Sequence, residues 1–221
     1  MSIAVPPSVT ITPGTHRFFD DLVTALASQA ALTAGYFTHA GHPGYRFLDD
    51  WPMKLGCMTR REVNSILEIE IKPASMLTPL TKFSWPTSLE LKFEVVTNVG
   101  TTASTLPAAA PVTSPLSGMK RICANIIEHA FIAYYERHKD KINDARSNAG
   151  AGGLPTLAFA NALRNTFAHS GVIHFTNEKA GVTVSWCGLS YSDKDNGRQV
   201  MYNDMSQGDV ILLMLEMDGL F

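Results

Sequence analysis

The strongest constraint on the fold is a helical repeat of apolar residues over residues 118–140. Its members recur at spacings of three and four, the separations that place side chains on one side of an α-helix. They are Met119, Ile122, Cys123, Ile126, Ala130, Phe131 and Tyr134. The polar residues Arg121, Asn125, Glu128 and His129 lie off this stripe. The pattern predicts a long, largely buried helix and therefore a mainly helical fold.

Composition narrows the class of protein. The chain has 221 residues, of which 45% are hydrophobic and 17% are charged, enough apolar residues for one sizeable core. The net charge is −2 and the isoelectric point is about 6.4, so any attraction to nucleic acid must come from a local cluster of positive charge.

The sequence carries little sign of a leader peptide, a membrane-spanning segment or a metal-binding motif. The N-terminus has no basic stretch before an apolar run, and no run of 18 apolar residues occurs, which predicts a cytoplasmic protein without membrane association. Cys57, Cys123 and Cys187 are widely spaced and form no CxxC pair. We therefore expect reduced thiols and no zinc site.

A second helix is predicted to begin at Pro155, because proline suits the first helical turn. At 100° per residue its two sides differ in chemistry. Phe159, Ala160, Leu163 and Phe167 lie on one side; Asn161, Arg164, Asn165 and Ala168 lie on the other, with His169 at the edge of that polar side. Gly171 is placed where a left-handed residue would end the helix.

The end of this helix gathers groups that suit phosphate chemistry. Arg164 is a fixed cation with several donors, Asn165 offers an amide, and histidine as a residue type titrates near neutrality. The same residue types also fit an ordinary helix terminus, where a cation interacts favourably with the last carbonyl groups. Composition and spacing leave both interpretations open.

The order Arg164, Asn165 and then His169 has the form R-N-x-x-x-H and resembles the R-x(4–6)-H signature of the HEPN superfamily, helical domains named for nucleotide binding. The flanking Phe-Ala-Asn-Ala-Leu and Ala-His-Ser-Gly are similar to the small plasmid- and phage-type members. The resemblance covers about 115–171 and leaves the first hundred and last fifty residues unexplained.

The resemblance implies a homodimer of helical bundles in which two copies of the motif face each other. It implies an endoribonuclease that cuts single-stranded RNA by attack of the 2′-hydroxyl, without metal or other cofactor, in defence, toxin or stress response. In this scheme His169 transfers a proton, Arg164 holds the phosphate, and Asn165 orients His169 or a phosphate oxygen. The secondary candidates are Ser170, Glu128 and His129.

Two other functions fit the same residues. One is a non-catalytic module of the same fold that binds RNA or a nucleotide, or serves as a dimeric scaffold. The other is a structural dimer in which Arg164 pairs with an acidic residue such as Glu128. An antitoxin or other regulatory partner leaves no trace in the sequence.

The first half of the chain carries weaker signals. Residues 1–14 read as an extended arm, and 15–221 as one domain whose first helix runs from Thr15 to about Thr38. The capping-box form Thr59-Arg60-Arg61-Glu62 predicts a short helix ending before Pro73. Residues 87–98 fit a strand or a helix, and 100–117 read as a flexible Ala/Thr/Pro excursion.

After Gly171 the apolar period changes from that of a helix to that of a strand. Val172–Phe175 and Val182–Trp186 predict a β-hairpin, the main part of an appendage over 172–203. Ser206 and Asp209 predict the start of a closing helix over 206–218. The expected fold is therefore mainly α: a HEPN-like helical bundle with a small antiparallel β-appendage near the C-terminus.

Overall fold

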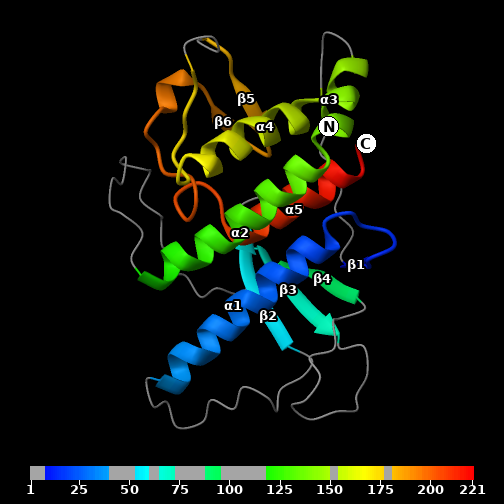
Figure 1. Cartoon of the computed structure of the whole chain (residues 1–221), viewed down its shortest axis with the longest axis vertical. Coiled ribbons are helices and arrows are strands. Elements are labelled where there is room, and N and C mark those ends of the chain that lie inside the picture. Colours follow the sequence, from blue (N-terminus) through cyan, green and yellow to red (C-terminus); the bar gives the residue numbers. More distant parts are fainter. Residues whose placement is uncertain are drawn as a thin grey trace.

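The computed structural model describes residues 8–39, 53–59, 65–72, 88–95, 118–149, 154–176 and 181–221. Within these ranges the protein is mainly α-helical and carries two small antiparallel sheets (Figure 1). The predicted excursion over 100–117 lies outside the described residues.

The helices pack into one core. They are α1 (Phe19–His39), α2 (Gly118–Arg137), α3 (Lys139–Asn148), α4 (Pro155–Ala168) and α5 (Gln207–Asp218). Helices α2 and α5 pack on each other; α1 packs on α2, and α4 packs on both α2 and α5 (Figure 1). The largest fully buried side chains include Tyr134, Tyr135, Phe131, Phe159, Phe18 and Phe19.

The predicted helix over 118–140 is two helices, because α2 ends at Arg137 and α3 begins at Lys139. The predicted stripe is buried, as expected, at Ala130, Phe131 and Tyr134. It is wrong at Ile122, which is 43% exposed. The buried side of α2 instead follows Ala124, Ile127, Glu128, Phe131, Tyr134 and Tyr135. This second stripe also has helical spacing, but the charged Glu128 interrupts it. The apolar periodicity of the sequence therefore does not indicate it.

A four-stranded antiparallel sheet accompanies the helices. It consists of β1 (Ser8–Ile11), β2 (Met53–Thr59), β3 (Ser65–Lys72) and β4 (Ser88–Val95) in the order β1-β4-β3-β2. Ile11 and Leu89 are fully buried in the helical core, and α5 contacts β2. The sheet is therefore part of the same packed unit.

This sheet corrects two expectations and decides between the two alternatives left open for residues 87–98. Residues 8–11 of the predicted arm form an edge strand, residues 65–72 of the predicted short helix form β3, and the ambiguous segment 87–98 contains β4. Strand β3 alternates Leu67, Ile69 and Ile71 with charged residues, and its register sets Leu67 opposite Phe93 and Ile69 opposite Leu91. Pairing with a distant strand overrode the local capping signal. Helix α1 also begins four residues later than predicted, at Phe19 rather than Thr15.

The C-terminal part contains a β-hairpin, but with different partners from those predicted. Strands β5 (Val184–Trp186) and β6 (Leu189–Tyr191) pair with each other through a turn at Cys187 and Gly188, whose φ angles of 45° and 79° suit a two-residue hairpin loop. Ile173 pairs with the chain near Arg198 instead. The closing helix α5 is confirmed, with the capping box of Ser206 and Asp209 at its start.

Candidate active site at the C-terminal end of helix α4

Helix α4 ends in a compact hydrogen-bonded turn. The backbone N–H of His169 donates to the carbonyl oxygens of Asn165 and Thr166, each at 3.1 Å, and the N–H of Gly171 reaches back to Thr166 O at 3.0 Å. Ser170 and Gly171 both have left-handed φ angles, 62° and 75°. This is the Schellman arrangement, with Ser170 rather than Gly171 at its left-handed position. The turn leaves the side chains of His169 and Ser170 exposed.

Gly171 lies where two other segments meet α4. A Cβ atom at this position would lie 2.6 Å from Gln199 Nε2 and 2.7 Å from Glu128 Oε1, closer than real Cβ atoms approach. The φ angle of 75° also disfavours any side chain. Glycine is therefore the residue that lets the Glu128 carboxyl group and the Gln199 amide reach the end of α4.

Glu128 is only 3% exposed, although the sequence suggested a solvent-facing residue. Burial raises the pKa of its carboxyl group, against the opposing effects of Arg121 and His129. None of the described residues donates a hydrogen bond to this carboxyl group. The neighbouring His129 is exposed, and its Nδ1 lies 2.6 Å from the carbonyl oxygen of Asn125 on the same helix.

Arg164 lies between α4 and α2. Its Nε is 2.5 Å from Glu136 Oε1, and its Nη1 donates to Asn165 Oδ1 at 3.0 Å. The acidic partner is thus Glu136, not Glu128. The Arg164 and Glu136 side chains are 29% and 36% exposed, so solvent screens this ion pair, although Nε itself is buried and donates no well-aligned hydrogen bond within the described residues.

The exposed ring of His169 lies against a second exposed imidazole, that of His174. The two ring centroids are 4.7 Å apart, with an angle of 48° between the ring planes. Sequence reasoning missed His174. The available signal was the alternation within 173–175, where the buried Ile173 and Phe175 flank it and leave His174 on the outer side.

The segment that carries His174 is tied to residues 196–200. The N–H of Ile173 donates to Arg198 O at 2.9 Å, and the N–H of Val200 donates to Gly171 O at 3.0 Å. Asn196 uses its side chain in both directions: its Oδ1 accepts from the N–H of Phe175 at 2.6 Å, and its Nδ2 donates to Phe175 O at 3.1 Å. These bonds fix the backbone on both sides of His174.

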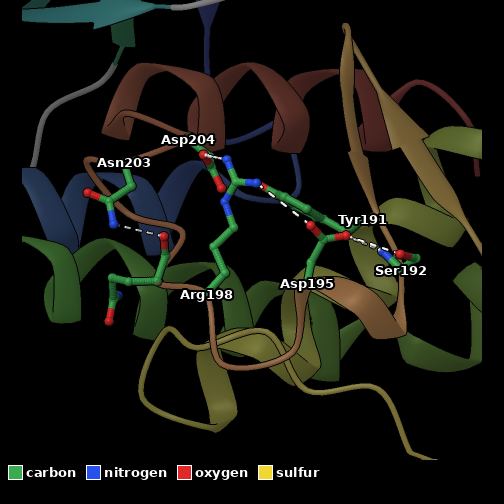
Figure 2. Close-up of polar contacts among 7 residues, drawn as sticks. Tyr191, Ser192, Asp195, Arg198, Asn203 and Asp204 are labelled. Carbon is green, nitrogen blue, oxygen red and sulfur yellow. Dashed lines mark hydrogen bonds and ion pairs between the residues drawn. The ribbon is translucent and has the colours of Figure 1, made fainter. Parts of the chain in front are cut away.

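Residues 196–200 are themselves held by an ion-pair network (Figure 2). Arg198 Nη2 lies 2.5 Å from Oδ1 of the buried Asp204, and Tyr191 donates its hydroxyl to Asp204 Oδ2 at 3.3 Å. Arg198 Nη1 lies 3.7 Å from Asp195. The hydrogen bond to Asp204 raises the pKa of Arg198, so this guanidinium is a permanent charge on the network.

The predicted site residues therefore form two groups. Arg164 and Asn165 contact each other beside Glu136, whereas His169 contacts His174. No hydrogen bond joins Arg164 to His169 in the described part of the chain, and five helical residues separate them by about 7.5 Å along the helix axis. Glu128 lies beneath the turn, and Ser170 lies beside His169 on its outer side.

Among the described residues, no group of three or more His, Cys, Asp or Glu side chains is arranged to hold a metal ion. None of the described helices combines the length and apolar character needed to cross a bilayer. Comparisons with protein-family models, curated proteins and solved structures gave no match to this chain.

Proposed function

We propose that this protein is a HEPN-like, metal-independent endoribonuclease that cleaves single-stranded RNA at the C-terminal end of α4. The observation that carries this proposal is that an imidazole and a guanidinium remain accessible on one rigid helix end. His169 is exposed on a turn fixed by three backbone hydrogen bonds, and Arg164 is partly exposed five residues earlier. In this proposal one bound RNA strand contacts both groups across about 7.5 Å of the helix axis.

The proposed chemistry needs only the RNA and these side chains. The 2′-hydroxyl attacks phosphorus, the bond from phosphorus to the 5′ oxygen breaks, and the products are a 2′,3′-cyclic phosphate and a 5′-hydroxyl. His169 accepts the 2′ proton or donates one to the departing oxygen. Arg164 stabilises the negative charge that develops on the non-bridging oxygens.

The surroundings of Arg164 suit an exchangeable anion site. Asn165 accepts a hydrogen bond from Nη1, which supports a role in positioning the guanidinium instead of the expected role of orienting His169 or a phosphate oxygen. Glu136 contacts the guanidinium at Nε before RNA binds, and in the proposed mechanism a phosphate replaces it. An ion pair with this exposure contributes about 1 kcal/mol or less, so the exchange costs little.

The remaining features of the proposal concern assembly and context. A homodimer with two facing motifs would supply several proton-transfer groups to one RNA strand. A cytoplasmic role in defence, toxin action or stress response agrees with this chemistry.

A non-catalytic RNA-binding or scaffold protein is the second candidate. One observation favours it: Glu136 neutralises Arg164, in a chain whose net charge is already −2. In that case the helix end would hold an RNA backbone or a dimer partner, and His169 would transfer no proton.

The test is a single-turnover assay on labelled single-stranded RNA in EDTA, with binding measured in parallel. We expect His169→Ala to abolish cleavage, and Arg164→Lys to slow it by about 10²-fold, because lysine cannot supply two parallel donors in the transition state. RNA binding should fall only modestly in Arg164→Lys, which keeps the charge.

Lys141→Met is the matched control, since it removes one exposed positive charge from α3, a helix that carries none of the proposed site residues. It should cleave at the parental rate. Cleavage that disappears in EDTA, or that proceeds equally fast in Arg164→Lys, would contradict the mechanism. Binding without cleavage in the parent protein would identify the second candidate.

A further inference from the structure

Metal-free RNA cleavage requires two proton transfers at one phosphate. A base removes the 2′ proton, and an acid protonates the 5′ oxygen as it departs. The motif Arg164-Asn165-x-x-x-His169 provides one imidazole for these two tasks. Within a single chain, the motif therefore leaves one of the two proton-transfer groups unassigned.

His174 has the position and chemistry to be that group. Its ring is exposed and lies 4.7 Å, centroid to centroid, from the ring of His169. Neither ring forms a salt bridge within the described residues, so both imidazoles are available to a ligand. Exposed side chains change rotamer on the picosecond-to-nanosecond timescale, which lets the two rings separate to admit a phosphate between them.

The backbone of His174 is held as firmly as that of His169. Ile173 and Phe175 are buried on either side, and both are hydrogen-bonded to the segment near Asn196 and Arg198. The side chain of His174 thus stands on a fixed backbone with only its own torsions free. Fixed placement of two reacting groups is what converts a chance encounter into an effective catalytic pair.

We propose that His174 is the second catalytic residue of the site, so that one chain supplies both the acid and the base. The inference rests on the proposed function and adds a residue outside the R-N-x-x-x-H motif. In the first step one neutral imidazole takes the 2′ proton as the O2′–P bond forms. The other, protonated imidazole gives its proton to the 5′ oxygen as the P–O5′ bond breaks, so one proton is taken up and one released.

The consequence concerns the dimer. If both groups belong to one chain, a second copy is not needed for proton transfer, although it can still help to hold RNA. The two arrangements differ in an observable way, because only groups in separate chains can complement each other when two variants are mixed.

The first experiment compares His169→Gln, His174→Gln and Thr176→Ala in single-turnover cleavage at several pH values. Thr176 is the control, since it is exposed on the same outer side, two residues beyond His174. We expect each His→Gln variant to cleave at least 10²-fold more slowly and to lose one limb of a bell-shaped pH–rate profile. Thr176→Ala should match the parent, and thermal midpoints should show that all variants fold.

The second experiment uses an RNA with sulfur in place of the bridging 5′ oxygen. A thiolate leaves without protonation far more readily than an alkoxide, because thiols have pKa values near 8.5. This substrate should restore cleavage in the variant that lacks the acid and not in the variant that lacks the base. Restoration in one of the two His→Gln variants therefore supports a divided acid–base pair.

Three outcomes separate the possible failures. Parental cleavage by His174→Gln, with cleavage lost in His169→Gln, overturns the role of His174 and keeps the proposed function. Recovery of cleavage on mixing the two folded His→Gln variants overturns the placement of acid and base in one chain. Parental cleavage by both variants overturns the proposed function itself.

Discussion

Two carboxyl groups in this protein are almost equally buried but differ in what surrounds them. Asp204 is 2% exposed. Its Oδ1 lies 2.5 Å from Arg198 Nη2, and its Oδ2 accepts a hydrogen bond from the Tyr191 hydroxyl at 3.3 Å. Glu128 is 3% exposed and receives no hydrogen bond or ion pair from any described residue. A buried charge is stable when it is paired and costly when it is not.

This difference separates two tasks within one neighbourhood. Asp204 anchors the segment that positions His174, since it fixes Arg198 and the chain around it. Glu128 lies under the turn that presents His169, at the position where Gly171 leaves no room for a side chain. We therefore expect the loss of Asp204's partner to be costly, and we expect Glu128, whose carboxyl pKa is raised by burial, to lower stability at neutral pH next to the candidate active site.

The largest expected effect comes from removing the cation of the stable pair. Arg198→Met leaves Asp204 buried with the Tyr191 hydroxyl as its one side-chain donor among the described residues, and we expect it to lower the free energy of unfolding by about 3 kcal/mol. Chemical denaturation at neutral pH measures this change. Arg164→Met is the matched control, since its partner Glu136 is 36% exposed, and it should change stability by about 1 kcal/mol or less.

Equal losses in the two arginine variants would remove the distinction between a structural and an exchangeable guanidinium. Arg198→Met should also slow RNA cleavage, because His174 loses its fixed backbone, while His169 keeps its own turn. A variant that loses stability but cleaves at the parental rate would show that the network does not position His174.

A smaller effect is expected at Gly171. Gly171→Ala must adopt a φ angle near 75° and must push aside the Glu128 carboxyl group and the Gln199 amide, with an expected loss of about 2 kcal/mol. Gly188→Ala is the control, because Gly188 has a similar φ of 79° but no other atom within 4 Å of an added Cβ. The difference between the two variants measures the close approach alone. Equal thermal shifts would show that the carboxyl group and the amide move away at no cost.

The sequence located the starts of α4 and α5 better than it located the neighbours of the site. Local signals were sufficient for α4, which begins at Pro155, and for α5, which begins with the capping box of Ser206 and Asp209. The sheet was missed because its strands owe their conformation to partners far along the chain, as with β3 and β4. In the site, the polar side of α4 marked Arg164, Asn165 and His169.

The rest of the site depends on contacts that no local pattern contains. His174 approaches His169 because residues 171–175 pair with residues 196–200, an interaction across more than twenty residues of sequence. Glu128 reaches Gly171 because α2 and α4 run antiparallel, with Phe131 against Phe167 and Glu136 against Arg164. Sequence periodicity indicated the buried side of each helix only approximately, and it placed Glu128 on the solvent side of α2.

The smallest expected effect tests Glu128 directly through its pH dependence. Burial raises the pKa of its carboxyl group in the folded protein above the ordinary value of 4.5. At pH values between 4.5 and this raised pKa, the carboxyl group therefore takes up a proton when the chain folds. Stability therefore falls as the pH rises through this window, and it stays lower above it. Glu128→Gln has nearly the same shape and remains neutral, so the variant should be more stable than the parent at pH 7 by about 1 kcal/mol and equally stable at pH 4. Denaturation curves at both pH values, with Glu136→Gln as the exposed control, measure the difference. A loss of stability in Glu128→Gln at pH 7 would mean that the carboxylate is charged and paired in solution, and the contrast with Asp204 would then disappear.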